Sequence, residues 1–482
     1  MPDYKVNGIQ LTSIANAIRT KGGTSASLTF PNGFVSAIEA IPSSDVQTDG
    51  DVIFIDYDGT FVAAKTKAQI NAMTADSDLP ANPSHTGLTA QGWNWTVVQL
   101  KAQLTAMPTQ KVYVGQKYVT TSGATEIDIE MQKERLSPYL TVCVNGEISV
   151  YWGDNTESDT VTGTSLDTIL SIPHTYTASG NYTITISVVN GSFAFNGGYY
   201  GGTGNTLLKK RNGGGNENIA YSNCVKAIRI GTGINCIDDC AFNYCYYLKY
   251  VTIPNNITSI GINTFAECLS LKCAIIPNGI TTLAATFMNC CSLLSVSMPY
   301  SVTNISGCFY GCSSLSNVFI PANVTNLGLS CFTYCYALQS IVIPNGVTEL
   351  RGFESCRALR SVYIPNTVTK IGPATFRNCN SLVNVVIPDS VTNMDNEIFS
   401  YCSSLISATI SSNVTNLNSA FNNCQSLKEC HIRSIVPPTI NSTTFNNIPY
   451  DCVIYVPQGY LNDYQSASGW SDYASKIQEE PT

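Results

Sequence analysis

The cysteines are the residues whose type and spacing most suggest chemistry. The chain of 482 residues holds 19 cysteines and three histidines. Cys308 and Cys312, with Cys331 and Cys335 later in the chain, form two Cys-x-x-x-Cys pairs. Four thiolates at such spacing can bind zinc tetrahedrally. A structural explanation competes, because Cys308 and Cys331 occupy a slot that small residues fill in other repeats, and it leads us to expect no metal and no cofactor.

Nine cysteines recur in register within the triplet Phe-x-x-Cys-x-x-Leu, and this repeat indicates the architecture. The triplets run from Phe242 to Phe421, a degenerate copy surrounds Phe445, and successive phenylalanines are 21 to 24 residues apart. Such a period is typical of a solenoid. Each unit begins with an alternating strand that ends at proline, and one unit alone cannot bury its apolar face. We therefore expect the repeated cysteines to be small apolar residues of a stacked core.

The consensus V-x-I-P-x-x-V-T-x-I-x-x-x-x-F-x-x-C-x-x-L resembles the BspA-like leucine-rich repeats of bacterial surface and host-contact proteins. The resemblance covers about residues 225–448 and implies a solenoid. We assign the solenoid to residues 223–449 and a C-terminal cap to residues 450–482. Aromatic residues of the cap, among them Tyr464 and Trp470, are expected to cover the open edge of the solenoid.

The run VIFIDYDGT holds two carboxylates and resembles the nucleophile strand of haloacid-dehalogenase-type phosphatases. The resemblance implies that Asp56 attacks phosphorus and that Asp58 acts as acid and base. That chemistry needs magnesium and a doubly wound sheet larger than residues 50–135 can form. We instead predict a small mixed module with a β-hairpin whose tip is Asp-Gly. The phosphatase ranks third among the functional interpretations, and we expect no enzyme.

Strong period-2 alternation predicts an immunoglobulin-like β-sandwich over residues 137–193. The strings WGDNT, from Trp152, and HTY, from His174, resemble polycystic-kidney-disease-type immunoglobulin-like domains. The resemblance implies a spacer or adhesion module. We expect Trp152 in the core, Asp154 capping a turn and His174 in a structural role. The Gly- and Asn-rich residues 194–222 are predicted to link this domain to the solenoid.

Residues 1–48 are predicted to form a separate small helical module. Their sequence VNGIQLTSIANAIRTKGG resembles the leading segment of tail-fibre proteins from phages and prophages of Gram-positive gut bacteria. The resemblance implies attachment to tail or baseplate proteins. The apolar faces are too small to be stable alone, so docking on a partner, self-association and packing onto the next module are alternatives.

Two sets of side chains are candidate receptor contacts. Alternation along the solenoid strands predicts an outward row whose middle is apolar and exposed, which marks an interaction site or a surface covered by a neighbouring subunit. The row contains Phe319, Val342, Tyr363 and Val386. Tyrosines near the turns form the second set, because tyrosine supplies rigid, amphipathic contact area. This set contains Tyr244, Tyr246, Tyr334, Tyr336 and Tyr401.

Composition narrows the function classes. The net charge is −8 and only 12% of residues are charged, which disfavours nucleic acid as a partner. No apolar run reaches the length that spans a membrane, and no secretory signal is visible. We expect a mainly β, multidomain chain.

These observations and resemblances favour a structural tail-fibre protein of a phage or prophage. The protein would be made in the host cytoplasm and carried in the virion, and its solenoid would bind a glycan or protein receptor on the host bacterial surface. The family resemblance also implies a homotrimer. The alternative is a bacterial cell-surface adhesin with the same repeats.

Overall fold

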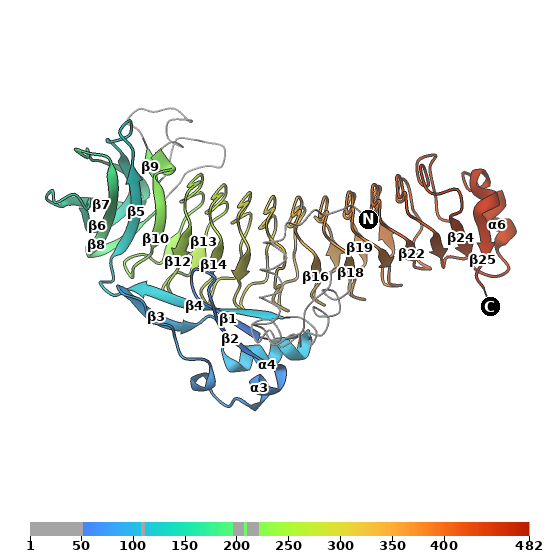
Figure 1. Cartoon of the computed structure of the whole chain (residues 1–482), viewed down its shortest axis with the longest axis horizontal. Coiled ribbons are helices and arrows are strands. Elements are labelled where there is room, and N and C mark those ends of the chain that lie inside the picture. The colour runs from blue at the N-terminus through green and yellow to red at the C-terminus, as the bar shows by residue number, and fades with distance from the viewer. Residues whose placement is uncertain (1–51, 108–110, 196–206, 210–220, 482) are drawn as a thin grey trace, which may run out of the picture.

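The structure, a computed structural model, describes residues 52–107, 111–195, 207–209 and 221–481. Figure 1 shows a long solenoid with a β-rich sheet at one end, a helical cap at the other and a small α/β module against its side. The chain is mainly β and the solenoid has about 11 turns, which confirms the predicted class and the solenoid. None of the helices in the described ranges has the length and apolarity needed to cross a bilayer. The predicted helical module of residues 1–48 lies outside the described residues.

The described part of residues 52–120, which we call the N-terminal module, forms a four-stranded sheet with two short helices. The strands lie in the order β2-β1-β4-β3. The elements are β1 (Val52–Ile55), β2 (Phe61–Lys65), α3 (Lys67–Ala72), η1 (Asp76–Asp78), β3 (Leu88–Trp93), α4 (Val97–Ala106) and β4 (Val112–Thr120). β1 and β2 are antiparallel, which confirms the hairpin predicted around Asp58 and Gly59. The helices begin at the capping boxes of Thr66 and Thr96.

A seven-stranded sheet closes the N-terminal end of the solenoid. Its order is β12-β10-β5-β8-β6-β7, with β9 paired to β6. The strands are β5 (Thr125–Met131), β6 (Tyr139–Tyr151), β7 (Asp159–Pro173), β8 (Gly180–Ala194), β9 (Leu208–Lys209), β10 (Val225–Arg229) and β12 (Tyr250–Thr252). The alternating strands predicted within residues 137–193 are present as β6, β7 and β8. Hydrogen bonds join them to the first solenoid coils in one continuous sheet, because β5 pairs with both β8 and β10.

The solenoid coils stack through two rows of short parallel strands. We call the face formed by the longer row the strand face. After β10 and β12 it contains β14 (Cys273–Ile275), β15 (Ser295–Ser297), β16 (Ser340–Val342), β18 (Ser361–Tyr363), β20 (Asn384–Val386), β22 (Ser407–Ile410), β23 (Glu429–Ile432), β24 (Val453–Val456) and β25 (Ile477–Glu479). The second row contains β11 (Cys236–Ile237), β13 (Ser259–Ile260), β17 (Glu349–Leu350), β19 (Lys370–Ile371) and β21 (Asn393–Met394).

One hydrophobic core runs through the seven-stranded sheet and the whole solenoid, from Ile127 to Ile477. The repeated phenylalanines form a continuous stack within it, from Phe242 to Phe445, with ring centroids 5.3 to 6.2 Å apart. The apolar side chains of this core are therefore buried between neighbouring coils, as the repeat predicts.

The C-terminal cap covers the last coil with aromatic side chains. Its helices are α6 (Leu461–Ser466) and η2 (Ser471–Lys476). Tyr464 and Trp470 are fully buried, and the Trp470 ring lies 5.8 Å from Phe445, the end of the phenylalanine stack. The Trp470 indole also donates to the Pro438 carbonyl at 2.7 Å. The cap thus supplies the apolar cover that an open solenoid end requires.

Candidate binding face

The repeated cysteines act as hydrogen-bond donors inside the core. In eight coils the thiol donates to the carbonyl oxygen of the repeat phenylalanine one coil earlier, over 3.1 to 3.3 Å. Cys331, outside this series, donates to Ile305 at 3.0 Å. Burial raises the pKa of Cys331 to about 12, so its thiol stays protonated at neutral pH.

The two Cys-x-x-x-Cys pairs lie within this core. Cys308, Cys312, Cys331 and Cys335 are all fully buried. Cys312 donates to Phe287 and Cys335 donates to Phe309, both at 3.1 Å. Zinc binding requires thiolates, whereas the thiols of Cys312, Cys331 and Cys335 carry protons that they donate to carbonyl groups. In the part of the chain that the structure describes, no three His, Cys, Asp or Glu side chains are grouped as metal ligands.

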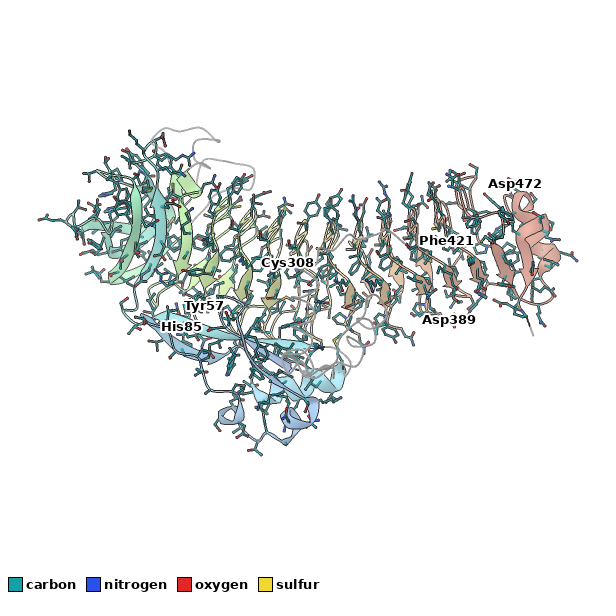
Figure 2. The ribbon with its side chains drawn as sticks, in the orientation of Figure 1. Tyr57, His85, Cys308, Asp389, Phe421 and Asp472 are labelled. Atoms are coloured by element: carbon teal, nitrogen blue, oxygen red, sulfur yellow. The ribbon has the colours of Figure 1, made fainter. Side chains whose placement is uncertain are left out.

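The two carboxylates of the hairpin have local structural contacts. Asp56 is buried, accepts a hydrogen bond from the Tyr57 amide at 2.8 Å and lies 2.6 Å from Nε2 of His85. Asp58 accepts from the Thr60 amide at 2.9 Å, as a turn residue does. Figure 2 labels Tyr57 and His85 where the hairpin meets the solenoid. Sequence reasoning treated His85 as isolated, because nothing local links it to a residue 29 positions earlier.

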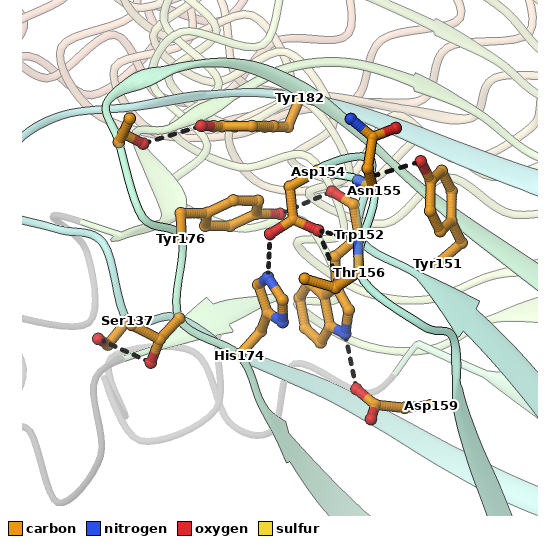
Figure 3. Close-up of polar contacts among 12 residues, drawn as sticks. Ser137, Tyr151, Trp152, Asp154, Asn155, Thr156, Asp159, His174, Tyr176 and Tyr182 are labelled. Atoms are coloured by element: carbon orange, nitrogen blue, oxygen red, sulfur yellow. Dashed lines mark hydrogen bonds and ion pairs between the residues drawn. The ribbon is translucent and has the colours of Figure 1, made fainter.

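His174 is held among aromatic and acidic neighbours in the seven-stranded sheet (Figure 3). Its Nε2 lies 2.8 Å from Asp154, and its ring stacks on Trp152 with centroids 4.5 Å apart. Asp154 also accepts from the Thr156 hydroxyl at 2.6 Å. Burial opposes ionisation, but the bonds from Thr156 and His174 outweigh it and lower the pKa of Asp154. These contacts fit the predicted structural role of His174 and the turn-capping role of Asp154.

The N-terminal module covers the first half of the strand face. Ile53 and Ile55 of β1 pack against Cys273 and Ile275 of β14. Gly115 of β4 lies directly on Ile275, and a Cβ at this glycine would approach the Ile275 Cδ1 to 2.4 Å. β4 therefore crosses the solenoid strands at a distance that only glycine permits.

Polar side chains fix the module in place. Asn94 donates through Nδ2 to the carbonyl oxygens of Ile276 at 3.2 Å and Ser297 at 3.1 Å. The indole of Trp95 donates to the Met298 carbonyl at 2.8 Å. Asn94 and Trp95 are at most 1% exposed, so these bonds form in a dry contact. Neither residue was singled out as a candidate, although the Trp-Asn-Trp string is an unusual one.

The prediction that Phe319 is exposed is wrong. Its side chain is 1% exposed and belongs to the core of the N-terminal module, where its ring lies 5.4 Å from Trp95. The strand expected at residues 317–319 is also missing. The cover comes from the same chain, not from a neighbouring subunit, and Phe319 leaves the set of candidate receptor contacts.

The second half of the strand face is open and hollowed. Tyr363 is 65% exposed and Val386 is 56% exposed, whereas Val342 is partly buried. Tyr363 and Val386 line a hollow of about 750 Å³ together with Asn366, Asn384, Asp389 and Arg433. Figure 2 places Asp389 on the same side of the solenoid as the N-terminal module. This half contains the two row members that are free to touch a partner.

A second hollow continues the first toward the C-terminal cap. It measures about 510 Å³ and is lined by Thr409, His431, Arg433, Pro457 and Glu480. We call the two hollows together the strand-face groove. His431 is held by Glu480, with Nδ1 2.9 Å from Oε1. Arg433 lines both hollows, and among the described residues its guanidinium has no ion-pair partner.

The tyrosines of the second candidate set lie on the turns and do not join the groove. Tyr334 and Tyr336 have ring centroids 6.1 Å apart, and Arg357 lies 4.6 Å from the Tyr336 ring. Tyr310, which sequence reasoning missed, adds to this cluster 5.4 Å from Tyr334. Tyr401 lies outside this cluster, and its side chain is 44% exposed.

Tyr244 and Tyr246 form a separate pair of turn tyrosines. Their rings lie 6.1 Å apart, and both side chains are partly buried. Tyr244 takes a left-handed backbone conformation with φ 61°, in the slot that Tyr334 and Tyr401 occupy in their own coils. The turn tyrosines are thus distributed over several coils, whereas the groove is continuous.

Comparison with protein families identifies the repeat. Residues 235–352 and 351–458 match the family described as BspA type leucine rich repeat region. These coils are BspA-type leucine-rich repeats. The match begins at residue 235, so the N-terminal module and most of the seven-stranded sheet lie outside it. No curated protein matches the chain.

Several solved structures are similar to part of this chain. A leucine-rich repeat protein from Bacteroides ovatus is 22% identical, with 50% of this chain and 76% of that chain covered and a TM-score of 0.38. A leucine rich cell surface protein from Faecalibacterium prausnitzii is 25% identical, with 44% and 80% covered and a TM-score of 0.28. The pneumococcal vaccine antigen PcpA is 19% identical, with 52% and 72% covered and a TM-score of 0.34.

Proposed function

We propose that this protein is a cell-surface binding protein of the adhesin type, and that the strand-face groove is its receptor site. The observation that carries the proposal is the pair of exposed side chains, Tyr363 and Val386, which line the hollow of about 750 Å³ in this groove. Large apolar side chains in a hollowed, solvent-facing site favour binding of a partner. The BspA-type repeats support display at a bacterial surface, because the repeat consensus resembles that of bacterial surface and host-contact proteins.

A double substitution in the groove tests the receptor site. Fluorescently labelled full-length protein is applied to panels of epithelial cells and Gram-positive bacterial cells, and bound protein is measured by flow cytometry. We expect the variant Tyr363→Ala with Val386→Ala to bind at least about tenfold less, because central anchors of an interface contribute 1 to 2 kcal/mol or more each. The matched control is Tyr450→Ala with Val436→Ala, since these side chains are 93% and 69% exposed and do not line the groove.

Two results would contradict this assignment. Full binding by the groove variant would remove the strand face from the receptor site. Loss of binding in Tyr334→Ala with Tyr336→Ala, combined with full binding by the groove variant, would move the site to the turn tyrosines.

A phage tail fibre is the second candidate function. The sequence of residues 1–48 supports it, because this segment resembles the leading segment of tail-fibre proteins. In this case the solenoid binds a receptor on the host bacterium, residues 1–48 attach to tail or baseplate proteins, and the assembly is a homotrimer. Peptide mass spectrometry distinguishes the candidates: an adhesin is found in the cell-surface fraction of the producing bacterium, and a tail fibre in purified virions.

A further inference from the structure

The hydrogen-bonded ladder of the strand face is interrupted at three places. Neighbouring strands β12 and β14 belong to separate sheets, and so do β18 and β20. The third interruption spans residues 317–319 between β15 and β16, where no strand forms. At each interruption, backbone groups that normally pair along a parallel ladder are released from that pairing.

Two of the interruptions lie beneath the N-terminal module. β4 crosses β12 and β14 at the first. Around residues 317–319 the module bonds to the preceding coil and to the interrupted coil itself: the Trp95 indole donates to the Met298 carbonyl at 2.8 Å, and the Gln103 side chain accepts from the Ala322 amide at 2.8 Å. Asn94 donates to the neighbouring Ser297 carbonyl at 3.1 Å. Side chains of the module thus bond to backbone groups on this part of the strand face; the Ser297 carbonyl also accepts from the Ile276 amide at 3.0 Å beside the β14–β15 ladder.

The same segment also supplies the apolar contact. Trp95 packs edge-on against Phe319, the outward side chain of the interrupted coil, with an interplanar angle of 65°. The Asn94–Trp95 segment thus combines an aromatic ring that packs on the outward Phe319 with polar groups that donate to backbone carbonyls of the strand face. The chain therefore contains its own example of how an interruption of this face is covered.

The third interruption, between β18 and β20, is uncovered. The Val383 amide still bonds to the Arg360 carbonyl at 3.1 Å beside it, but the strands themselves are not paired. Residues of both strands line the hollow of about 750 Å³. Tyr363 and Val386 occupy the outward positions that correspond to Phe319 at the covered interruption.

We infer that the strand-face groove binds a protein segment that carries an aromatic side chain beside an amide side chain, as the Asn94–Trp95 segment does at the covered interruption. The inference rests on the proposed function and names the class of partner. The aromatic side chain packs on Tyr363 and Val386, and the amide donates to backbone carbonyl groups of the strand face, as Asn94 does to Ile276 and Ser297. Arg433, which has no ion-pair partner among the described residues, pairs with an acidic residue of the segment; arginine and tyrosine are the side chains that protein interfaces favour as anchors.

A cyclised, fluorescent peptide with the sequence of Gln91–Val97 (QGWNWTV) serves as the probe. Its binding to the full-length protein is followed by fluorescence anisotropy, and its site is mapped by hydrogen exchange. We expect saturable binding with new protection of residues 361–364 and 384–387. Tyr363→Ala with Val386→Ala should weaken this binding at least about tenfold, as should alanine at the second tryptophan of the peptide. The control variant Tyr450→Ala should bind the peptide as the unchanged protein does.

The results that overturn the inference are distinct from those that overturn the proposed function. Protection confined to residues around Met298 and Ala322 would show that the peptide competes with the module and that the groove is not an equivalent site. An absence of peptide binding, or Tyr363-dependent binding to a glycan array, would exclude a protein segment as the ligand. In both cases groove-dependent attachment to cells can persist, so the proposed function is judged by the cell-binding assay alone.

Discussion

The Trp95 indole packs edge-on against Phe319, with ring centroids 5.4 Å apart, and both side chains are 1% exposed. The contact joins a residue of the N-terminal module to a solenoid coil that lacks a strand. Phe319 consequently belongs to the core of the module and not to the receptor-binding surface. The stability of the N-terminal module is therefore coupled to that of the solenoid.

Phe319→Ala is expected to lower the free energy of unfolding by about 3 to 5 kcal/mol, because it leaves a cavity beneath Trp95. Chemical denaturation followed by tryptophan fluorescence measures the change. Hydrogen exchange should also show faster exchange in the N-terminal module. Leu329→Ala is the control, since Leu329 is 69% exposed and its loss leaves no cavity. Equal stability of the two variants would contradict the packing described here.

The cysteines give a second prediction, in a thiol titration. All 19 are free thiols, and 17 of them are buried; Cys291 is exposed and Cys236 is partly buried. We expect Cys291 to react rapidly with a thiol reagent in the native protein, Cys236 slowly, and the rest only after denaturation. Cys291→Ala should remove the rapid phase. Fewer than 19 thiols after denaturation without reductant would indicate disulfides and contradict the protonated core.

Buried thiols also predict a loss of stability at alkaline pH. Burial raises the pKa of Cys273 and of Cys331 to about 12, whereas an unfolded thiol titrates near pH 8.5. Above pH 8.5 the unfolded state releases these protons and the folded state keeps them. Stability is therefore fully present below pH 8.5 and falls as the pH rises toward 12, by about 1.4 kcal/mol per pH unit for each such thiol. Urea unfolding under reducing conditions from pH 7 to pH 10.5 measures the decline, and a flat profile would be inconsistent with it.

Lys117 has the opposite dependence on pH. It lies in β4, is 3% exposed, and burial lowers its pKa from 10.5 to about 8. Between pH 8 and 10.5 the folded state loses this proton first, so the Lys117 contribution to stability improves as the pH rises. Lys117→Met should therefore stabilise the protein below pH 8 by up to about 3 kcal/mol, and the gain should shrink toward pH 10.5.

Paired urea titrations of the Lys117→Met variant and the unchanged protein isolate this contribution from that of the thiols. Lys428→Met, at an exposed position, serves as the control. A stability difference that stays constant from pH 7 to pH 10.5 would mean that Lys117 remains protonated in the folded protein.

The repeat could be predicted from sequence because its determinants are local. Phe376 and Cys379 stand three residues apart in one turn, and the same spacing in every coil requires the coils to stack. The hairpin tip at Gly59 was similarly evident. The contact between Trp95 and Phe319 was not, because an outward apolar residue on a strand has the same pattern whether it is exposed or covered by a distant segment. The pair of Asp56 and His85 was missed for the same reason.

The two exposed side chains of the candidate site could also be predicted from the sequence. Alternation placed Tyr363 and Val386 on the outward row, and they do lie exposed on one groove. Their hollow is lined by residues of β18 and β20, two strands that are not paired, and no single residue type reveals such an absence of backbone pairing. Arg433 joins it from a coil two repeats later in the chain.

The contacts of the N-terminal module with the solenoid extend from Gln91, which accepts from the Asn255 amide, to Gln103, which accepts from the Ala322 amide. Ladder hydrogen bonds between parallel coils run along the solenoid axis, so a stretching force would break them one coil at a time. The N-terminal module lies across several coils, so a stretching force acts on its contacts as shear and is distributed over the coils that it crosses. Under tension, the coils that carry the strand-face groove should therefore unfold before the coils between Asn255 and Ala322, which the N-terminal module covers.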